Sequence, residues 1–407
     1  MSRVKGKKAV VKIKRLLALL LCAVTLFSFS GCHLLTSDDS ENLDFHENAA
    51  YDSEMIDEDD DSFIFTWLSY MEIAVTNTLK SEDAYTAYIG THFKNMKHIG
   101  VTDCFVQVRP FADALYNSAF FPLSTHAEKA DFDVLGAIIA VAEKYDISVH
   151  AWINPYRTAG DISCFSALGI ENSDAVVTPS GTYFNPASVK VQRLILDGAR
   201  ELLEDYNIKG IHIDDYFYPP DMNSADKKQF ELYKEKGGEL SLAQWRRENV
   251  NTLLRSLYAV VKSFGEDKIF SVSPSGNIDK NINQLYADVK LWCSEEGYCD
   301  IVLPQIYFGF ENESLPFIKT LSLWAEMNRG HKVKIVPALA LYKAGKEDIY
   351  AGEGGRDEWI NNSDMLKRQI EEVYKRNINS FALYSASYIN FSETFLKDEL
   401  NNLKSVI

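Results

Sequence analysis

The stretch ASVKVQRLILDGARELLEDYNIKGIHIDDY, residues 187–216, contains the unit that decides the fold. Its first part, 187–206, places apolar residues three and four positions apart, which is the spacing of an amphipathic helix. Its last part, 210–216, is a short apolar run that ends in charged and aromatic residues, as buried strands often do. The stretch therefore predicts a helix followed by a buried strand.

The same strand and helix unit recurs through residues 62–407. The predicted strands are 63–70, 103–109, 148–154, 210–216, 269–275, 300–307, 333–340 and 380–387. The predicted helices are 83–98, 131–145, 187–206, 240–264, 281–296, 313–328, 363–377 and 392–405. Strict alternation predicts a parallel sheet, and eight units favour closure into a (β/α)8 TIM barrel over an open doubly wound sheet. No Pro-, Gly- or Ser-rich segment interrupts these residues, so we predict a single α/β domain.

The N-terminal residues have the pattern of an export signal. A basic segment precedes an apolar run at 16–29, and Ser30, Gly31 and Cys32 follow it. We interpret residues 1–32 as a signal that resembles those of bacterial lipoproteins, with Cys32 as the lipidated residue; the alternative is a plain cleaved signal peptide. The lipoprotein interpretation predicts an extracytoplasmic protein that is anchored to the bacterial cell membrane through this lipid.

Residues 33–61 are rich in aspartate and glutamate and contain few large apolar side chains. Such a segment cannot bury enough apolar surface to offset the entropy lost on ordering. We therefore predict an acidic, disordered linker between the signal and the barrel.

Charge and cysteine content exclude several classes of protein. The formal net charge of −16 argues against a nucleic-acid partner. Four cysteines lie outside the signal, and only Cys293 and Cys299 are close enough in sequence for a local bridge, if their geometry allows one. The sequence has no CxxC or HExxH motif, no histidine pair at metal-ligand spacing and no glycine-rich phosphate turn after a strand. We therefore expect no metal and no cofactor.

Active sites of these barrels lie at the carboxyl ends of the strands. Alternation along 210–216 turns His212 and Asp214 toward the barrel interior, with Asp214 at its mouth. The same alternation predicts inward side chains at Gln107, Arg109, His150, Trp152, Asn154, Gln305 and Tyr307. Amides and charged groups can bind sugar hydroxyls, and aromatic rings can stack on sugar rings. The predicted substrate-binding residues are Arg109, Asp113, Trp152, Asn154, Tyr156, His212, Tyr216, Gln305 and Tyr307.

Glycosidases usually use two carboxyl groups, one protonated and one ionised. Asp214 is the first candidate for the nucleophile or ionised partner, and its alternative role is that of a structural acceptor. Asp215 is the second candidate for the same role and also a candidate acid, with a loop acceptor as its alternative. Glu72, just beyond the first strand, is another candidate acid. Asp113 could instead pair with Arg109 and shape the pocket.

Motifs on at least five strands resemble the glycosyl-hydrolase-like family 10 proteins of bacteria. They are QVRPFADALYNSAFFPLS (107–124), VHAWINPYR (149–157), GIHIDDYFYPP (210–220), RRENVN (246–251) with FSVSPSGN (270–277), and DIVLPQIYFG (300–309). The resemblance covers residues 63 to 400 and implies a glycosidase-type barrel, often on exported lipoproteins, whose members are linked to cutting cell-wall glycan strands. It also implies a distant relation to retaining α-galactosidase-type barrels, whose nucleophile lies at the end of strand four, as Asp214 does here. The first strand, TWLSYMEIA (66–74), departs from the usual family arrangement, which lacks the acid found at Glu72.

These observations together favour a membrane-anchored glycoside hydrolase that cleaves a peptidoglycan glycan strand or another surface polysaccharide. The alternative is a non-catalytic glycan-binding surface lipoprotein on the same scaffold, because the second carboxylate is not assigned. A transporter-linked binding protein fits worse, since such proteins are two-lobed open folds.

Overall fold

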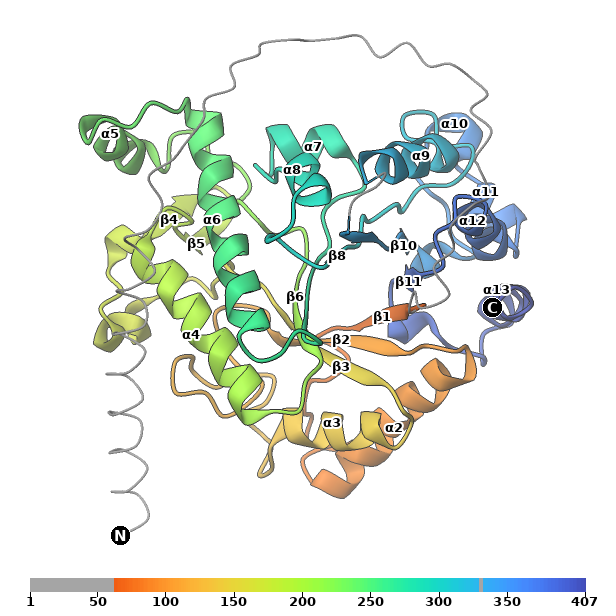
Figure 1. The fold of residues 1–407 in the computed structure, drawn as a ribbon. Helices are drawn as coiled ribbons and strands as arrows, with labels where there is room; N and C mark the ends of the chain where they lie inside the picture. The colour runs from red at the N-terminus through yellow and green to blue at the C-terminus, as the bar shows by residue number, and fades with distance from the viewer. Residues whose placement is uncertain (1–61, 329–331) are drawn as a thin grey trace. The chain divides into compact units, whose positions relative to one another are not determined.

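The structure of the protein is a computed structural model that describes residues 62–328 and 332–407. The predicted signal (1–32), with its lipidated Cys32, and the predicted linker (33–61) lie outside the described residues. Strands occupy the centre of the described part, and helices surround them (Figure 1).

The central sheet is entirely parallel. Its strands are β1 (Ile64–Leu68), β2 (Asp103–Arg109), β3 (Ser148–Ile153), β6 (Gly210–Ile213), β7 (Ile269–Val272), β8 (Ile301–Val302), β9 (Lys334–Ile335), β10 (Ala338–Leu339) and β11 (Phe381–Leu383). Their order in the sheet is β10-β11-β1-β2-β3-β6-β7-β8-β9, so neighbours in the sheet are neighbours along the chain. Each strand lies within one of the ranges predicted from the sequence.

Strands β9 and β10 are two halves of one strand, and this closes the sheet into a barrel. The N–H groups of Val336 and Ala338 each donate to carbonyls of the β8 segment over 2.9 Å. Toward β11, the carbonyl of Pro337 accepts the N–H of Ala382, and the carbonyl of Leu339 accepts the N–H of Tyr384. With β9 and β10 counted together, eight strands form a closed ring, which confirms the predicted (β/α)8 barrel.

The helices follow the predicted ranges, with additions. The barrel helices are α2 (Glu82–His98), α3 (Val134–Glu143), α4 (Val189–Asp205), α6 (Leu242–Lys262), α9 (Phe317–Met327), α12 (Met365–Tyr374) and α13 (Thr394–Lys404), while the predicted helix 281–296 is divided into α7 (Ile278–Asn283) and α8 (Val289–Ser294). Side chains of Ser81, Asp133, Ser188 and Ser241 accept backbone N–H groups at the starts of α2, α3, α4 and α6, which fixes where these helices begin.

Additional elements occupy the loops. They are the antiparallel hairpin β4 (Ala175–Thr178) and β5 (Gly181–Phe184), and the helices α5 (Lys227–Glu235), α10 (Gly352–Gly355) and α11 (Glu358–Asn361), together with four short 3-10 helices. The hairpin and α5 follow the carboxyl ends of β3 and β6, so they border the end of the barrel where a site is expected.

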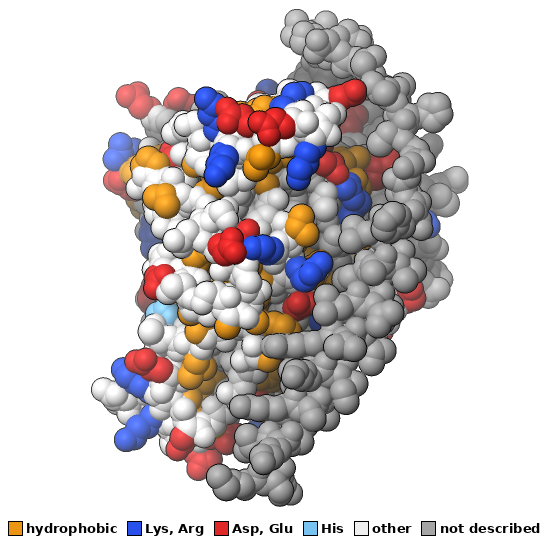
Figure 2. All heavy atoms as spheres, turned by 90° about the vertical axis from the view of Figure 1, so that its left-hand side faces the viewer, with side chains coloured by type: hydrophobic (Ala, Val, Ile, Leu, Met, Phe, Trp, Pro, Cys, Tyr) orange, Lys and Arg blue, Asp and Glu red, His pale blue; other side chains and the backbone are white. Residues whose placement is uncertain are grey.

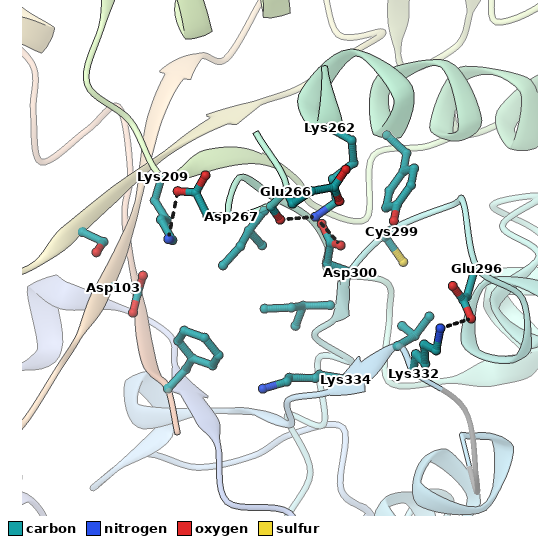
Figure 3. A pocket seen from close by; sticks show the side chains of 16 residues that line it. Asp103, Lys209, Lys262, Glu266, Asp267, Glu296, Cys299, Asp300, Lys332 and Lys334 are labelled. Atoms are coloured by element: carbon teal, nitrogen blue, oxygen red, sulfur yellow. Dashed lines mark hydrogen bonds and ion pairs between the residues drawn. The ribbon is translucent and has the colours of Figure 1, made fainter. Parts of the chain in front are cut away.

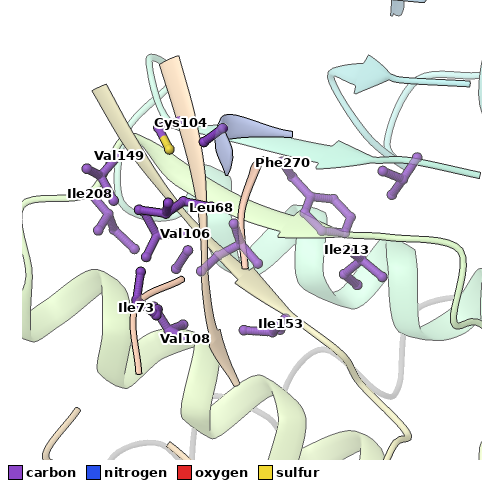
Figure 4. Close-up of a cluster of buried hydrophobic side chains, with 14 of the residues drawn as sticks. Leu68, Ile73, Cys104, Val106, Val108, Val149, Ile153, Ile208, Ile213 and Phe270 are labelled. Carbon is purple, nitrogen blue, oxygen red and sulfur yellow. The ribbon is translucent and has the colours of Figure 1, made fainter. Parts of the chain in front are cut away.

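Side chains alternate between two cores. Those that point outward from the strands, such as Val106, Val149 and Ile213, pack against the helices (Figure 4). Those that point inward fill the barrel and form a separate cluster, which comprises Phe65, Trp67, Phe105, Trp152, Ile301, Leu303, Val336, Ala338 and Ala382. Gly210 at the start of β6 is required by this packing, because a Cβ there would lie 1.8 Å from the carbonyl oxygen of Ile269.

The structure decides whether the two neighbouring cysteines form a bridge. Cys293 and Cys299 are both buried free thiols, so the local bridge does not form. Among the described residues, no helix combines the length and apolar character needed to cross a membrane.

Candidate active site

Asp214 follows the last residue of β6 and lies at the carboxyl end of the barrel, which we call the mouth. An unbroken chain of amides leads to its carboxylate. Gln107 Nε2 donates to Asn154 Oδ1 over 2.6 Å, and Asn154 Nδ2 donates to Asp214 Oδ1, also over 2.6 Å. All three side chains are buried and come from neighbouring strands. The inward orientation predicted for these three residues is confirmed.

The surroundings of Asp214 disfavour its charged form. Burial, followed by the nearby charge of Asp215, raises the pKa of Asp214 from 3.8 to about 7, although the Asn154 bond and Arg157 act in the opposite direction. A carboxyl group with such a pKa can hold a proton or release it near neutral pH, as catalytic carboxyl groups must.

Asp215, the next residue, is only partly buried. Burial raises its pKa, and Lys280 and the amide of Gln305 are the main groups that lower it. Gln305 also donates from Nε2 to the carbonyl of Ser273 over 3.0 Å, so its amide group is held beside the aspartate. Two adjacent carboxyl groups with distinct partners therefore face this part of the mouth.

Both interior histidines contact protein groups, and His212 does so through both ring nitrogens. His212 Nε2 accepts from Trp67 Nε1 over 3.0 Å, and its Nδ1 lies 2.8 Å from Ser271 Oγ. Burial lowers the pKa of His212 well below its usual value, so the ring is neutral. His150 lies deeper and contacts Asp103 over 2.9 Å. The prediction that His212 binds substrate is not supported, because the ring is fully buried and both nitrogens are occupied.

Tyrosines line the opposite wall of the mouth. The ring of Tyr307 lies 5.7 Å from that of Tyr384 and 5.6 Å from that of Tyr342. Burial, the two tyrosines and both aspartates raise the pKa of Tyr307, which places this residue in the same electrostatic environment as Asp214 and Asp215. Tyr384 also packs on Trp67 at 5.7 Å. Tyr384 was not among the predicted site residues, although it lies within the predicted strand 380–387 and directly follows β11.

The prediction that Arg109 faces the barrel interior is wrong. The pairing of β2 with β3 shifts by one residue between Gln107 and Arg109, and this irregularity turns Arg109 outward. Its guanidinium lies 4.1 Å from the ring centre of Phe121, and a Cβ on Gly198 of α4 would lie 2.5 Å from its Nη1. Arg109 is 1% exposed, so it cannot contact a substrate at the mouth.

The predicted pairing of Asp113 with Arg109 is also absent from the described residues. Asp113 Oδ1 instead accepts the N–H of Phe111 over 2.9 Å and so holds the loop after β2. Tyr156 and Trp152 are buried as well, Tyr156 in the core between strands and helices and Trp152 inside the barrel. Neither ring presents a face to solvent for stacking on a sugar, whereas Tyr216 is 43% exposed.

Glu72 lies in the turn after β1 and is partly buried. Its Oε2 accepts the Ser69 N–H over 2.8 Å and also the Ser69 hydroxyl. It is close enough to Tyr384 to raise the pKa of that tyrosine. These contacts give Glu72 a local role in the turn, and its role as an acid stays a prediction.

Arg157, which the sequence analysis did not select, lies at the mouth. It follows Asn154 by three residues, and its charge lowers the pKa values of both Asp214 and Asp215. The NPYR segment at 154–157 was the signal that could have identified it, because it directly follows β3.

A cavity of about 490 Å³ lies at the other end of the barrel, where the strands begin (Figure 3). Charged groups on its walls pair with one another: Lys262 with Asp300 at 2.7 Å, Lys332 with Glu296 at 3.1 Å and Lys209 with Asp267 at 3.5 Å. Because these charges satisfy each other, we place the candidate active site at the mouth. No group of three or more potential metal ligands occurs among the described residues.

The surface carries mixed charge. On the face shown in Figure 2, basic and acidic side chains lie next to one another over the described residues, and no basic patch stands out there.

A closed (β/α)8 barrel with paired carboxyl groups, amides and tyrosines at the carboxyl ends of its strands belongs to the glycosidase class of architecture. A model of the glycosyl hydrolase-like 10 family matches residues 73–353. The chain belongs to this family.

Two relatives of the chain are also named glycosyl hydrolases. The glycosyl hydrolase YngK of Bacillus subtilis is 28% identical over 337 residues, which are 75% of this chain and 64% of YngK. The glycosyl hydrolase DigH of Escherichia coli K12 is 26% identical over 339 residues, 74% of this chain and 75% of DigH. The chain therefore spans slightly under two thirds of YngK and three quarters of DigH.

Solved structures share the fold at low sequence identity. The glycoside hydrolase domain of PgaB (BpsB) from Bordetella bronchiseptica matches with a TM-score of 0.58 and 11% identity, covering 85% of this chain and 99% of that domain. An endo-1,4-β-mannanase from Rhizomucor miehei matches with a TM-score of 0.56 and 11% identity, covering 84% of this chain and 94% of the mannanase chain. These matches concern the barrel alone.

Proposed function

We propose that the protein is a glycoside hydrolase that uses carboxyl groups at the barrel mouth to cleave a bacterial surface polysaccharide. The observation that carries this proposal is Asp214, a buried carboxyl group whose pKa is raised to about 7 at the carboxyl end of β6. Hydrolysis of a glycosidic bond needs one carboxyl group that donates a proton and one that is ionised. A carboxyl group that titrates near neutral pH beside a second carboxyl group suits this need.

Asp214 is proposed as the nucleophile or ionised partner, because a pKa of about 7 still leaves a large fraction of this carboxyl group ionised at neutral pH, and the amide of Asn154 orients its oxygen. Asp215 is the alternative for this role and the first candidate for the acid, with Glu72 as the second. Tyr216, Gln305 and Tyr307 are proposed to contact the sugar, since they lie beside these carboxyl groups. Asn154, which is buried and bonded to both Gln107 and Asp214, is proposed to orient Asp214 instead.

The proposed substrate is the glycan strand of peptidoglycan. Membership of the glycosyl hydrolase-like 10 family supports a glycan substrate. The signal-like residues 1–32 support a location outside the cytoplasm, where such strands are found. We further propose that a lipid on Cys32 anchors the protein to the membrane near this substrate.

The test is hydrolysis by the full-length protein and by its Asp214→Asn variant. Purified peptidoglycan, peptide-free glycan strands and α-glucans are incubated with each, and new reducing ends are measured. We expect the wild type to cleave a cell-wall substrate and the variant to lose at least about 1,000-fold in turnover, because the amide can neither attack nor exchange a proton. Glycan binding should persist, since an asparagine keeps the shape and can still accept from Asn154.

Asp267→Asn is the matched control, because Asp267 lies at the opposite end of the barrel. It should retain wild-type turnover. Near-normal turnover by Asp214→Asn would refute the role of Asp214 and transfer it to Asp215. A wild type that binds glycan strands without cleaving any of them would instead identify a non-catalytic glycan-binding protein.

A further inference from the structure

Arg157 is held in an unusual way at the barrel mouth. Its guanidinium carbon lies 4.5 Å from the ring centre of Phe111 and 4.5 Å from that of Tyr216. The two rings come from the loops after β2 and β6, so the cation is contacted by aromatic groups from two different strands. Such contacts stabilise a guanidinium and restrict its orientation.

The backbone of Arg157 is also fixed. It forms an isolated antiparallel bridge with Tyr183 of β5, next to a bond of 2.7 Å from the Thr158 hydroxyl to the carbonyl of Thr182. On the other side, the N–H of Phe184 donates to the carbonyl of Tyr156 over 2.9 Å. The hairpin β4–β5 therefore holds the residue that carries the guanidinium.

The aromatic neighbours are themselves anchored. The N–H of Phe111 donates to Asp113, and the ring of Tyr70 contacts Phe111 edge-on at 5.2 Å. The N–H of Tyr216 points to Asp214 Oδ1 at 3.4 Å. Phe111, Arg157 and Tyr216 thus form a preorganised group, which we call the arginine clamp.

The guanidinium has no polar partner of its own in the described residues. Within 62–328 and 332–407, its nitrogens form no hydrogen bond and no ion pair, although it influences both aspartates. Buried Arg246, by contrast, uses its nitrogens on Asp226, Tyr286 and the carbonyl of Asn223. Arg157 is partly exposed, so its N–H groups are free to bind a ligand at the mouth.

A guanidinium whose orientation is restricted by ring contacts can offer its N–H groups to a planar anion. A carboxylate matches that geometry with two parallel hydrogen bonds, whereas a neutral hydroxyl matches only one donor. The raised pKa values of Asp214 and Asp215 reduce the negative charge that would repel such an anion nearby.

We propose that Arg157 recognises a carboxylate on the sugar bound at the mouth, so that the protein selects acidic over neutral glycans. This inference rests on the proposed function for the location of the sugar, and it adds the residue that determines specificity. The carboxylate could belong to a uronic acid or to a lactyl ether on an amino sugar, and the experiment separates these two sources.

The experiment measures binding of two matched pairs of ligands to the full-length protein by calorimetry. One pair is a disaccharide containing N-acetylmuramic acid and its methyl ester; the other is a disaccharide containing glucuronic acid and its methyl ester. Esterification removes the charge and keeps the sugar. We expect the free acid of one pair to bind about 10- to 100-fold more tightly than its ester, as for hydrogen bonds between charged groups. The pair that shows this ratio identifies the source of the carboxylate.

Arg157→Gln should reduce the acid-to-ester ratio to about one, and Arg157→Lys should leave an intermediate ratio because a lysine cannot form two parallel hydrogen bonds. Arg255→Gln is the matched control, since Arg255 also lies over a tyrosine ring but on an exposed face, where it pairs with Glu248. It should keep the wild-type ratio. Thermal unfolding of each variant verifies that it is folded.

Equal binding of acid and ester by the wild type, no binding of either pair, or an unchanged ratio in Arg157→Gln would overturn the inference. Its failure is separable from failure of the proposed function. A protein that cleaves glycans but ignores the carboxylate refutes only the inference. One that prefers the acid through Arg157 but cleaves nothing refutes only the hydrolase.

Discussion

At the scale of single residues, the chemistry of the mouth depends on the burial of the Asp214 carboxyl group. Asp214 is 5% exposed and accepts one strong amide hydrogen bond, but burial outweighs that bond and raises its pKa. An exposed aspartate at the same sequence position would be fully ionised at neutral pH. Folding therefore creates the proton-exchanging property that a glycosidase needs.

This raised pKa predicts a pH-dependent stability. Because the folded-state pKa of about 7 lies above the ordinary value of 3.8, the stabilising effect of the bound proton is complete below the unfolded pKa and is lost as pH rises toward about 7. Asp214→Asn cannot ionise, so its stability relative to wild type should rise over this window, by up to about 4 kcal/mol at about 1.4 kcal/mol per pKa unit. Urea unfolding of both proteins from pH 4 to pH 8 measures this difference in the free energy of unfolding. A difference that stays constant or shrinks with pH would contradict the assignment.

At the scale of elements, the irregularity in β2 decides which side chains reach the mouth. Gln107 points inward and starts the amide chain, whereas Arg109, two residues later, is packed between β2 and α4. Simple alternation would have placed both on the same side. A shift of one residue in strand pairing moves a charged group from the site to the helix layer.

Two substitutions on β2 test whether Gln107 acts at the mouth while Arg109 does not. Gln107→Leu removes the donor to Asn154 and should lower kcat on a cleaved glycan by about 10-fold or more, as expected when a positioning hydrogen bond is lost. Arg109→Met keeps the length of the side chain and should leave kcat and KM within about twofold, since Arg109 does not reach the mouth. A large rise in KM for Arg109→Met would restore its predicted role in substrate binding.

A second pair of substitutions tests the contact between α4 and β2. Gly198→Ala would place a Cβ 2.5 Å from Arg109 Nη1 and from the ring of Phe121, so it should destabilise the protein by about 1–3 kcal/mol despite the better helix propensity of alanine. Gly90→Ala in α2 is the control, because its Cβ would meet nothing closer than 4.0 Å. It should stabilise by about 0.5–1 kcal/mol. The free energy of unfolding of each variant is measured by chemical denaturation. If both substitutions changed it in the same direction, this packing would be contradicted.

At the scale of the whole molecule, the barrel separates two environments. The end of the barrel opposite the mouth holds a cavity with paired charges. The mouth holds the two aspartates and the guanidinium of Arg157, which has no ion pair within the described residues. The loops that border the mouth contain the hairpin β4–β5 and α5, which carry no part of the barrel itself. This separation lets loops determine recognition while the barrel determines stability.

The proposed anchor is tested on the full-length protein in its bacterial host or a related one. Cys32→Ala should release the protein from the membrane fraction or mislocalise it, because the lipid that holds it can no longer be attached. Cys164→Ala is the control, since Cys164 is an exposed cysteine within the barrel. Its distribution between the fractions should match that of the wild type. If Cys32→Ala leaves both membrane association and processing of the precursor unchanged, the lipoprotein interpretation is wrong.

The sequence by itself determined the number, type and order of the barrel elements and the place of Asp214. Strand and helix periodicity are local properties, so each predicted strand range contains an observed strand of the barrel, although several of these strands are shorter than predicted. Asp214 followed from counting alternate residues along 210–216. What remained beyond reach depended on non-local contacts: the outward turn of Arg109, the burial of Tyr156 and the two occupied nitrogens of His212.

Only the tertiary structure revealed the arginine clamp. Phe111, Arg157 and Tyr216 lie far apart in the sequence and on loops, whose paths carry no periodic signal. Their meeting depends on the pairing of β2, β3 and β6 as neighbours in the sheet, which brings the ends of these strands together, and on the hairpin β4–β5, which holds Arg157 in position. The physical reason is that local patterns encode which face of an element is apolar, whereas a site depends on distances between elements that only folding sets.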